Sequence, residues 1–322
     1  MSLALSSLLL ALLTACCEGH AASSRNTSMT CGSPYTLVGN ECLYFMVFAK
    51  VTFQEAHYTC QTADGGLANI ISATQMKAVV DYIKDSDFKS KDFWLDGTDS
   101  EEEGKWATVS GQPILMGTPF WASYLAHDEP NDYLCKEDCL VLSYDEFYYM
   151  NDVSCDDKSH PLCQAPPTLT AEDEGAATAL SGSLDCPFMF NPVGGLCLAF
   201  VLWEKLSWTD ARQICHGMNG DLVAITDIEV LRALYMHLQD ENIADHTFWV
   251  GGSDAEKEGD WRWTTNEAVD MGTPFWGLYK YQQEPTAGIF GNCLTLKSPG
   301  GYYFRDDSCH EKHNPLCMYV EP

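Results

Sequence analysis

The sequence of 322 residues predicts an α+β protein built from two copies of one domain. The string MGTPFW occurs at 116–121 and again at 271–276, and helix-start signals precede short apolar, strand-like segments in each copy. Most of the cysteines fall into two matching series with an offset of 155, then 154, residues, and such a repeat indicates duplication. The first series is Cys31, Cys42, Cys60, Cys139, Cys155 and Cys163, and the second is Cys186, Cys197, Cys215, Cys293, Cys309 and Cys317.

Length and composition set the expected boundaries. Two domains are the usual number for a chain of this length. We expect a signal peptide at 1–22, cleaved between 15 and 22, a first domain at 31–164, a linker at 165–183 and a second domain at 184–322. The linker range is rich in Pro, Ala, Thr, Ser and Gly, which predicts that the two domains move relative to each other.

The N-terminal segment predicts export. Its first fifteen residues form an apolar run that is too short to span a bilayer, as in a secretory signal peptide. The residues around Cys16 also fit a bacterial lipoprotein signal, but the sequon at Asn26 predicts N-glycosylation and favours a eukaryotic route. No other segment is long and apolar enough for membrane insertion, so we expect a secreted, extracellular protein.

In the first copy, two helices are expected before the first strand. Thr52 and Glu55 have capping-box spacing and open a helix through Cys60. Ser72 opens a second helix that runs through Ile83. The apolar segments at 93–95 and 140–142 predict short strands.

The second copy repeats these helix signals. Ser207 with Asp210 predicts the start of its first helix. Thr226 with Glu229 predicts the start of the second, which continues through Leu238. Trp94 and Trp249, at equivalent places in the predicted strands, are expected to pack in the cores.

A long polar stretch at 96–138 separates the two strands of the first copy. A loop of this length in a compact domain is either functional or an argument against the assignment. Oxygen-bearing side chains gather in it and just after it, and a hard cation such as Ca²⁺ takes 6 to 8 oxygen ligands. The pattern predicts a calcium site, and the alternative is an acidic, solvated surface without metal. These side chains are Glu129, Asn131, Asp132, Glu137, Asp138, Asn151 and Asp152.

Together these motifs resemble the C-type lectin domain, and the resemblance covers nearly all of the chain outside the signal and linker ranges. It is carried by the two helices, the Trp-centred strand, Glu-Pro-Asn at 129–131, Glu-Asp-Cys at 137–139, Asn-Asp at 151–152 and the cysteine spacing. A tandem pair behind a signal peptide resembles the secreted lectins of invertebrate, especially arthropod, innate immunity. The resemblance implies small antiparallel sheets, a long calcium-binding loop and three disulfides in each domain. The implied pairs are Cys31–Cys42, Cys60–Cys163, Cys139–Cys155, Cys186–Cys197, Cys215–Cys317 and Cys293–Cys309.

The resemblance also implies a ligand set. Carboxylates beside the metal accept, and Asn amides donate, the hydrogen bonds of two neighbouring sugar hydroxyls. The Glu-Pro-Asn order, with a cis peptide before Pro130, goes with mannose-type glycans, so we expect mannose, glucose, N-acetylglucosamine or fucose, for example on microbial surfaces. The principal Ca²⁺ is expected on Glu129, Asn131, Glu137, Asn151 and Asp152, of which the first four also contact the sugar. A supporting Ca²⁺ is expected on Asp99, Glu103, Asp132 and Asp138.

The second copy departs from this pattern. Glu-Pro-Thr at 284–286 replaces Glu-Pro-Asn, Gly-Asn-Cys at 291–293 replaces Glu-Asp-Cys, and Arg305 replaces the Asn of Asn-Asp. Arg is a permanent cation and repels Ca²⁺ at close range. We therefore expect this site to be empty or very weak, with Arg305 paired to Glu284 or Asp306 in place of the metal.

Cys135 has no counterpart in the second copy and leaves an odd number of cysteines after the signal range. An odd cysteine in an exported protein indicates either an intermolecular disulfide, and hence a disulfide-linked dimer, or a free thiol. A buried or capped thiol is the other interpretation.

The remaining patterns exclude several classes of function. A formal net charge of −28 argues against nucleic-acid binding, which needs clustered Lys and Arg. No zinc-hydrolase motif and no nucleophile motif is present, so we do not expect an enzyme. The sequence predicts a calcium-dependent lectin that acts in pathogen recognition or agglutination, and the alternative is a C-type-lectin-like protein-binding module without sugar binding.

Overall fold

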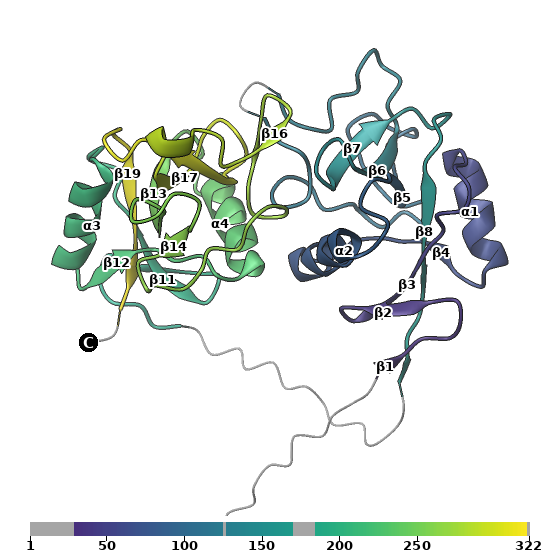
Figure 1. Cartoon of the computed structure of the whole chain (residues 1–322), viewed down its shortest axis with the longest axis horizontal. Coiled ribbons are helices and arrows are strands. Elements are labelled where there is room, and N and C mark those ends of the chain that lie inside the picture. The colour runs from purple at the N-terminus through teal and green to yellow at the C-terminus, as the bar shows by residue number, and fades with distance from the viewer. Residues whose placement is uncertain (1–28, 125–126, 170–183, 321–322) are drawn as a thin grey trace, which may run out of the picture.

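The computed structural model describes residues 29–124, 127–169 and 184–320, which fold into two domains lying side by side (Figure 1). The predicted signal peptide, Asn26 and most of the predicted linker lie outside the described residues. Inside the linker range, β9 (Thr168–Leu169) pairs with β1 (Met29–Thr30). Regular structure attached to the first domain therefore continues past its expected end.

The first domain has the predicted two helices and a sheet. The sheet order is β2-β3-β8-β5-β6-β7, with β4 also paired to β8, and β5 and β8 are its one parallel pair among the described strands. The elements after β1 are β2 (Thr36–Val38), β3 (Glu41–Phe45), α1 (Phe53–Thr62), β4 (Gly66–Leu67), α2 (Ala73–Asp85), β5 (Phe93–Thr98), β6 (Cys139–Ser143), β7 (Tyr149–Val153) and β8 (His160–Ala165).

The second domain repeats this arrangement. Its sheet order is β10-β11-β19-β13-β17-β18, with β12 paired to β19 and β14 paired to β13, and β15 and β16 form a separate hairpin. The elements are β10 (Asn191–Val193), β11 (Leu196–Phe200), α3 (Trp208–Gly217), β12 (Gly220–Leu222), α4 (Ile228–Asp240), β13 (Phe248–Ser253), β14 (Arg262–Trp263), β15 (Leu278–Tyr279), β16 (Gln282–Gln283), the 3₁₀ helix η1 (Gly288–Phe290), β17 (Cys293–Leu296), β18 (Phe304–Asp307) and β19 (Asn314–Tyr319).

Three of the four predicted helix starts are confirmed. The Thr52 hydroxyl accepts from the Glu55 backbone N–H and the Glu55 carboxylate accepts from the Thr52 N–H, which is a complete capping box. Ser72 caps α2 and Ser207 caps α3. These caps satisfy backbone donors that have no partner inside the helix.

The predicted start of α4 at Thr226 is wrong. Asp227 is the N-cap, and its carboxylate accepts from the Glu229 backbone N–H at 2.9 Å. The Glu229 side chain does not reach back to the cap but accepts from the backbone N–H and the hydroxyl of Thr74 in the first domain. A contact between the domains therefore takes up the group that the local pattern assigned to a capping box.

All six implied disulfides are confirmed, three in each domain. Their Cα–Cα distances lie between 5.1 and 5.5 Å. Cys60–Cys163 ties α1 to β8, and Cys215–Cys317 ties α3 to β19 in the same way. Cys139–Cys155 joins the start of β6 to the segment just after β7, so it closes the region that follows the long loop.

Trp94 and Trp249 are core residues, as predicted. Neither has any exposed surface. The Trp94 indole N–H donates to the Val51 carbonyl, and the Trp249 indole N–H donates to the Leu206 carbonyl. Each ring therefore has its one polar group satisfied inside its own domain.

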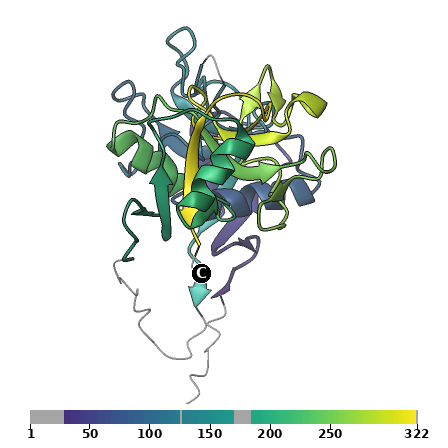
Figure 2. The same ribbon diagram turned by 90° about the vertical axis from the view of Figure 1, so that its left-hand side faces the viewer.

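The prediction that the two domains move relative to each other is wrong. Buried side chains from both domains form one continuous hydrophobic cluster. Helices α2 and α4 lie against each other at the centre of the molecule (Figure 1). Figure 2 shows the second domain in front of the first, with the loop-rich side of both domains uppermost. The composition of the linker gave no sign of this contact, because the contact is made by the folded domains.

Some of the hydrogen bonds across this contact form reciprocal pairs. The Tyr149 hydroxyl donates to the Trp276 carbonyl at 2.6 Å, and the Tyr303 hydroxyl donates to the Trp121 carbonyl, also at 2.6 Å. Both tyrosines are fully buried, and their rings meet edge to face with centroids 5.0 Å apart. We call this contact, made by residues 116–121, 271–276, Tyr149 and Tyr303, the docking interface.

The repeated string MGTPFW supplies a second reciprocal pair. The Thr118 hydroxyl donates to the Gly301 carbonyl, and the Thr273 hydroxyl donates to the Phe147 carbonyl. Trp121 and Trp276, the last residues of the two strings, are 1% and 0% exposed. Each copy of the string therefore contacts the other domain.

Candidate functional site

The long loop of the first domain lies between β5 and β6 and rises at the top of the domain (Figure 1). Three of the predicted ligands meet where this loop passes β7. The Asn131 amide group donates to Glu129, and the Asn131 and Asp132 backbone N–H groups donate to the Asp152 carboxylate. The Glu129-Pro130 peptide is cis, as the resemblance implies. The chain therefore places Glu129, Asn131 and Asp152 side by side.

Two carboxylates are held together at this point. Glu129 is 8% exposed and Asp152 has no exposed surface. Burial, and then the neighbouring Asp152 carboxylate, raise the pKa of Glu129 well above its usual range. Like charges in a buried place favour a bound cation or a proton.

Glu137 and Asn151 border the same place. The Glu137 carboxylate accepts from the Tyr133 backbone N–H at 2.9 Å. Burial raises the pKa of Glu137, although that N–H lowers it, and the charge of Asp152 raises it further. Asn151 is half-buried on β7, directly before Asp152 and opposite Val141 of β6. All five predicted ligands of the principal site therefore lie on the loop or on β7 beside it.

A second acidic cluster joins three of the four predicted supporting ligands. One carboxylate oxygen from each of Asp99, Glu103 and Asp138 lies within 4.8 Å of the others. Asp99 is 3% exposed; its Oδ2 accepts from the Gly104 N–H, whereas its buried Oδ1 has no partner. The fourth predicted ligand, Asp132, is outside this cluster and accepts from the Glu137 N–H.

These residues fit a hard divalent cation. The donor set consists of carboxylate and amide oxygens, which Ca²⁺ prefers. The unpartnered Asp99 Oδ1 is a buried acceptor, and buried polar atoms normally have a partner. Within the described ranges, this cluster is the one group of three or more Asp, Glu, His and Cys side chains close enough to share an ion. The histidines of the described residues form no such group.

The second domain has the same backbone hydrogen bonds as this site but a different set of charged side chains. The backbone N–H groups of Thr286 and Ala287 donate to Asp306 at 3.1 and 2.7 Å, as those of Asn131 and Asp132 do to Asp152. The Glu284-Pro285 peptide is also cis.

Arg305 fills the degenerate site. Its Nη1 lies 3.3 Å from a Glu284 carboxylate oxygen, so the predicted pairing of Arg305 with Glu284 is confirmed. Arg305 is 1% exposed and Glu284 is 7% exposed, so the two charges neutralise each other inside the protein. The Asp306 carboxyl is buried beside Glu284, and the guanidinium offsets part of the cost of burying the two acids together.

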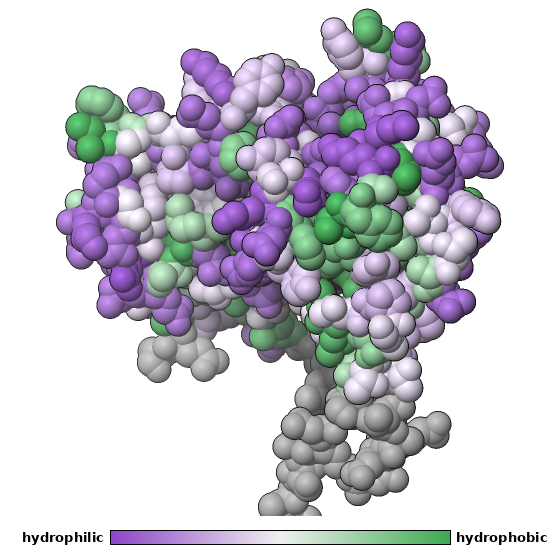
Figure 3. Space-filling model, turned by 45° about the vertical axis from the view of Figure 1, so that its right-hand side comes forward, coloured by the Kyte–Doolittle hydropathy of each residue, from purple (hydrophilic) through white to green (hydrophobic). Residues whose placement is uncertain are grey.

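Cys135 is exposed and forms no disulfide within the described chain. It follows Tyr133 and Leu134, which are 66% and 68% exposed. The interpretation of Cys135 as a buried thiol is therefore wrong, because its loop projects from the domain. Figure 3 shows hydrophilic side chains over the upper part of the molecule and a hydrophobic patch below them.

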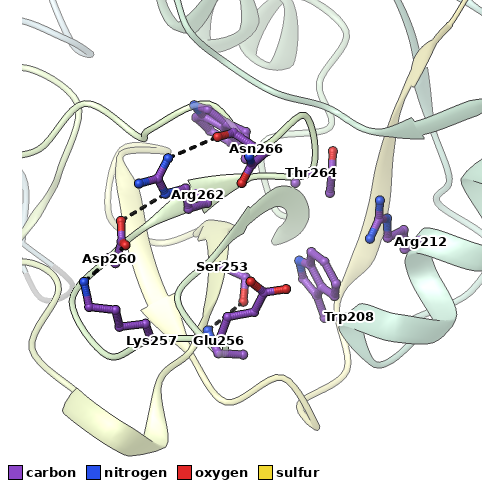
Figure 4. A pocket seen from close by; sticks show the side chains of 12 residues that line it. Trp208, Arg212, Ser253, Glu256, Lys257, Asp260, Arg262, Thr264 and Asn266 are labelled. Atoms are coloured by element: carbon purple, nitrogen blue, oxygen red, sulfur yellow. Dashed lines mark hydrogen bonds and ion pairs between the residues drawn. The ribbon is translucent and has the colours of Figure 1, made fainter.

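A separate cleft of about 520 Å³ lies between α3 and the β13–β14 region of the second domain (Figure 4). Three cations line it, and each has an acidic partner. Arg212 pairs with Asp221 at 2.9 Å, while Lys257 and Arg262 both contact Asp260, at 3.5 and 3.0 Å. Because these charges already neutralise one another, the cleft offers no free cluster comparable to the acidic loop.

The sequence did not predict the residues that make hydrogen bonds next to the Glu129 segment of the loop. The Tyr124 hydroxyl donates to the Glu146 carboxylate, and the Ser123 hydroxyl donates to Asp128 at 2.6 Å. It also missed Tyr149 and Tyr303 at the docking interface. Tyr149 and Tyr303 occupy equivalent positions under the 154-residue offset. A tyrosine kept at the same position in both copies indicates a shared contact for its hydroxyl, so this repeat could have pointed to the docking interface.

Comparison with known proteins gives consistent matches. The sequence profile described as Lectin C-type domain matches residues 49–165 and 204–319. The chain is 23% identical to human C-type mannose receptor 2 over 243 residues, which are 72% of this chain and 16% of that receptor. It is 25% identical to human lithostathine-1-beta over 154 residues, 47% of this chain and 89% of that protein.

Solved structures give similar matches. The mouse scavenger receptor C-type lectin carbohydrate-recognition domain has a TM-score of 0.36 and 23% identity, over 42% of this chain and 98% of that one. A calcium-independent type II antifreeze protein has a TM-score of 0.37 and 20% identity, over 45% of this chain and 100% of that one. Among the described residues, no helix is long and apolar enough to cross a membrane.

Proposed function

The chain belongs to the C-type lectin family, with two such domains in tandem, and on that premise we propose that it is an extracellular, calcium-dependent protein that binds mannose-type glycans through its first domain. The observation that carries the proposal is the buried pairing of Glu129 with Asp152, with the Asn131 amide held against Glu129. In the second domain the equivalent buried acids, Glu284 and Asp306, have the Arg305 guanidinium beside them, whereas no Lys or Arg of the described residues pairs with Glu129 or Asp152. The six disulfides support an oxidising, extracellular setting.

The proposed roles follow from the chemistry of each side chain. The principal Ca²⁺ is assigned to Glu129, Asn131, Glu137, Asn151 and Asp152, and the supporting Ca²⁺ to Asp99, Glu103, Asp132 and Asp138. When bound, calcium supplies the positive charge to which neighbouring sugar hydroxyls coordinate. A hydroxyl both donates and accepts, so the Glu129 and Glu137 carboxylates are the acceptors and the Asn131 and Asn151 amides are the donors.

The second domain is assigned no calcium. Arg305 stands where the first domain has Asn151, and it already neutralises Glu284. One intact sugar site per chain follows. Agglutination of cells, and any role in recognising foreign surfaces, then requires that more than one chain act together.

The test uses the full chain on mannose and galactose resins, with calcium or with a chelator. We expect retention on mannose that the chelator abolishes. Changing Glu129→Gln and Asn131→Asp together exchanges the acid and amide positions and is expected to shift retention towards galactose. The control, Glu258→Gln, changes an exposed acid on the corresponding loop of the second domain and should leave mannose retention unchanged.

Two outcomes count against the proposal. Retention that persists in the chelator would remove the role of calcium. Failure of the full chain to bind any sugar would favour the alternative, a protein-binding module, for which the exposed Tyr133 and Leu134 on the loop are the supporting observation.

A further inference from the structure

Arg305 pairs with Glu284 in its own domain, and its side chain also makes a hydrogen bond to the first domain. It lies on β18 and is 1% exposed. Its Nη1 donates to the Leu278 carbonyl at 2.7 Å, and its Nη2 donates to the Ser123 carbonyl of the first domain at 3.0 Å. Ser123 and Leu278 are equivalent under the 155-residue offset. One guanidinium therefore joins the same segment of the two copies.

The segment that it holds in the first domain supports Glu129 directly. The Glu129 backbone N–H donates to the Ala122 carbonyl at 2.9 Å. The Ser123 hydroxyl donates to Asp128 at 2.6 Å, and residues 123 and 128 form an antiparallel bridge. Arg305 is thus two hydrogen bonds and one peptide unit away from a predicted metal ligand.

The second domain has space for this side chain because residue 277 is glycine. A Cβ at Gly277 would lie 2.8 Å from Arg305 Nη2, 2.9 Å from Arg305 Cζ and 3.0 Å from the Tyr303 Cβ. In the first domain, Ala122 is equivalent to Gly277, and the shorter Asn151 is equivalent to Arg305. The cross-domain contact therefore runs in one direction, from the second copy to the first.

We propose that Arg305 is a positioning residue for the cation site of the first domain, so that the degenerate site of the second domain serves as a support for the intact one. The proposal rests on the proposed function for its role in metal binding. A buried guanidinium with three acceptors is fixed in place, and it keeps its charge at every physiological pH. The Ser123 carbonyl also accepts from the Leu278 backbone N–H at 3.3 Å, and Arg305 contacts both residues, so it holds this pair and, through the segment of Ser123, the backbone that carries Glu129.

The test compares three variants of the full chain. Arg305→Met removes the contact with Ser123 and keeps much of the side-chain volume. Gly277→Ala keeps the arginine but crowds it. Arg232→Met is the matched control, because Arg232 also crosses the interface, donating to the Met116 and Thr118 carbonyls at 2.7 Å, but holds a segment that does not pair with Glu129.

Two readouts are taken. Amide hydrogen exchange of Glu129 and Asn131 in metal-free protein reports the positioning without any metal. We expect about tenfold faster exchange in Arg305→Met and Gly277→Ala, the scale of one lost hydrogen bond to a charged group, with no change in Arg232→Met. Calorimetric titration with Ca²⁺ should give a Kd about tenfold weaker in the same two variants.

The outcomes separate the two proposals. If wild-type protein binds no Ca²⁺, the proposed function fails, and the exchange rates still decide the role of Arg305. If Glu129 exchanges at the wild-type rate in both Arg305→Met and Gly277→Ala, the positioning role is overturned. If Arg305→Met does not fold, Gly277→Ala decides. Equal acceleration in Arg232→Met would assign the effect to docking in general and would also overturn it.

Discussion

Removal of the Tyr149 hydroxyl tests whether the docking interface stabilises the whole chain. In Tyr149→Phe the Trp276 carbonyl loses a donor at 2.6 Å, and in Tyr303→Phe the Trp121 carbonyl loses its donor at the same distance. Both tyrosines are fully buried, so water cannot replace the lost donor. A buried acceptor left without a partner costs about 1–3 kcal/mol.

Each single variant is therefore expected to lose ~1–3 kcal/mol of unfolding free energy, a large part of the 5–15 kcal/mol that is typical of a domain. The two rings are in contact, with centroids 5.0 Å apart, so the double variant should not equal the sum of the singles. Urea unfolding followed by tryptophan fluorescence measures all three. We expect wild-type protein to unfold in one transition and the double variant to unfold in two, because the docked domains come apart first.

The matched control is Tyr35→Phe, which removes a hydroxyl that donates to the Ala63 carbonyl at 3.0 Å within the first domain. It should weaken that domain without separating the transitions. Losses below ~0.5 kcal/mol in both interface variants would refute the reasoning, since that is the usual effect of a surface substitution. Two transitions in wild-type protein would refute it as well.

Three further outcomes are expected. Wild-type protein should migrate as a disulfide-linked dimer on a non-reducing gel, and Cys135→Ser should run as a monomer and lose agglutination; a monomeric wild type would leave the exposed Cys135 a free thiol. A chelator should make 129–138 more sensitive to protease, because carboxylates repel once the cation is gone; equal cleavage rates would contradict this. Burial raises the pKa of Asp307, but hydrogen bonds from His313 and Lys297 lower it to about 2. A carboxyl whose pKa is lowered on folding stabilises the fold above its unfolded pKa and loses that effect as pH falls, so between about pH 4 and pH 2 wild-type protein should lose ~2 kcal/mol more than Asp307→Asn does.

The fold could be predicted because its signals are local or repeated. The capping box of Thr52 with Glu55 depends on four consecutive residues, and the structure keeps it. The disulfide pairs came from the family resemblance and are confirmed, although six cysteines in one domain allow fifteen arrangements. Where a distant contact competed, as at Thr226, the local pattern failed, since Glu229 is used by Thr74.

The candidate site was predictable as a set of residues but not as an arrangement. The type and order of the side chains predict Glu129, Asn131 and Asp152 as members of one ligand set, and the structure brings these three residues together. Asp132 shows the limit, because its side chain turns to the Glu137 N–H and stays outside the Asp99 cluster. The support of the loop by Arg305 was not predictable, since the contact joins positions 123 and 305 across two domains.

The docking interface also has a consequence for each copy on its own. When residue i of one copy contacts residue j of the other, and j contacts i in return, the interface is isologous, the kind that closes a two-fold symmetric dimer of identical subunits. Tyr149 with Trp276 and Tyr303 with Trp121 are such a pair inside one chain. A separated domain would therefore expose a self-complementary apolar face and would tend to pair with another copy of itself. In the tandem chain each domain is already paired with the other, one to one.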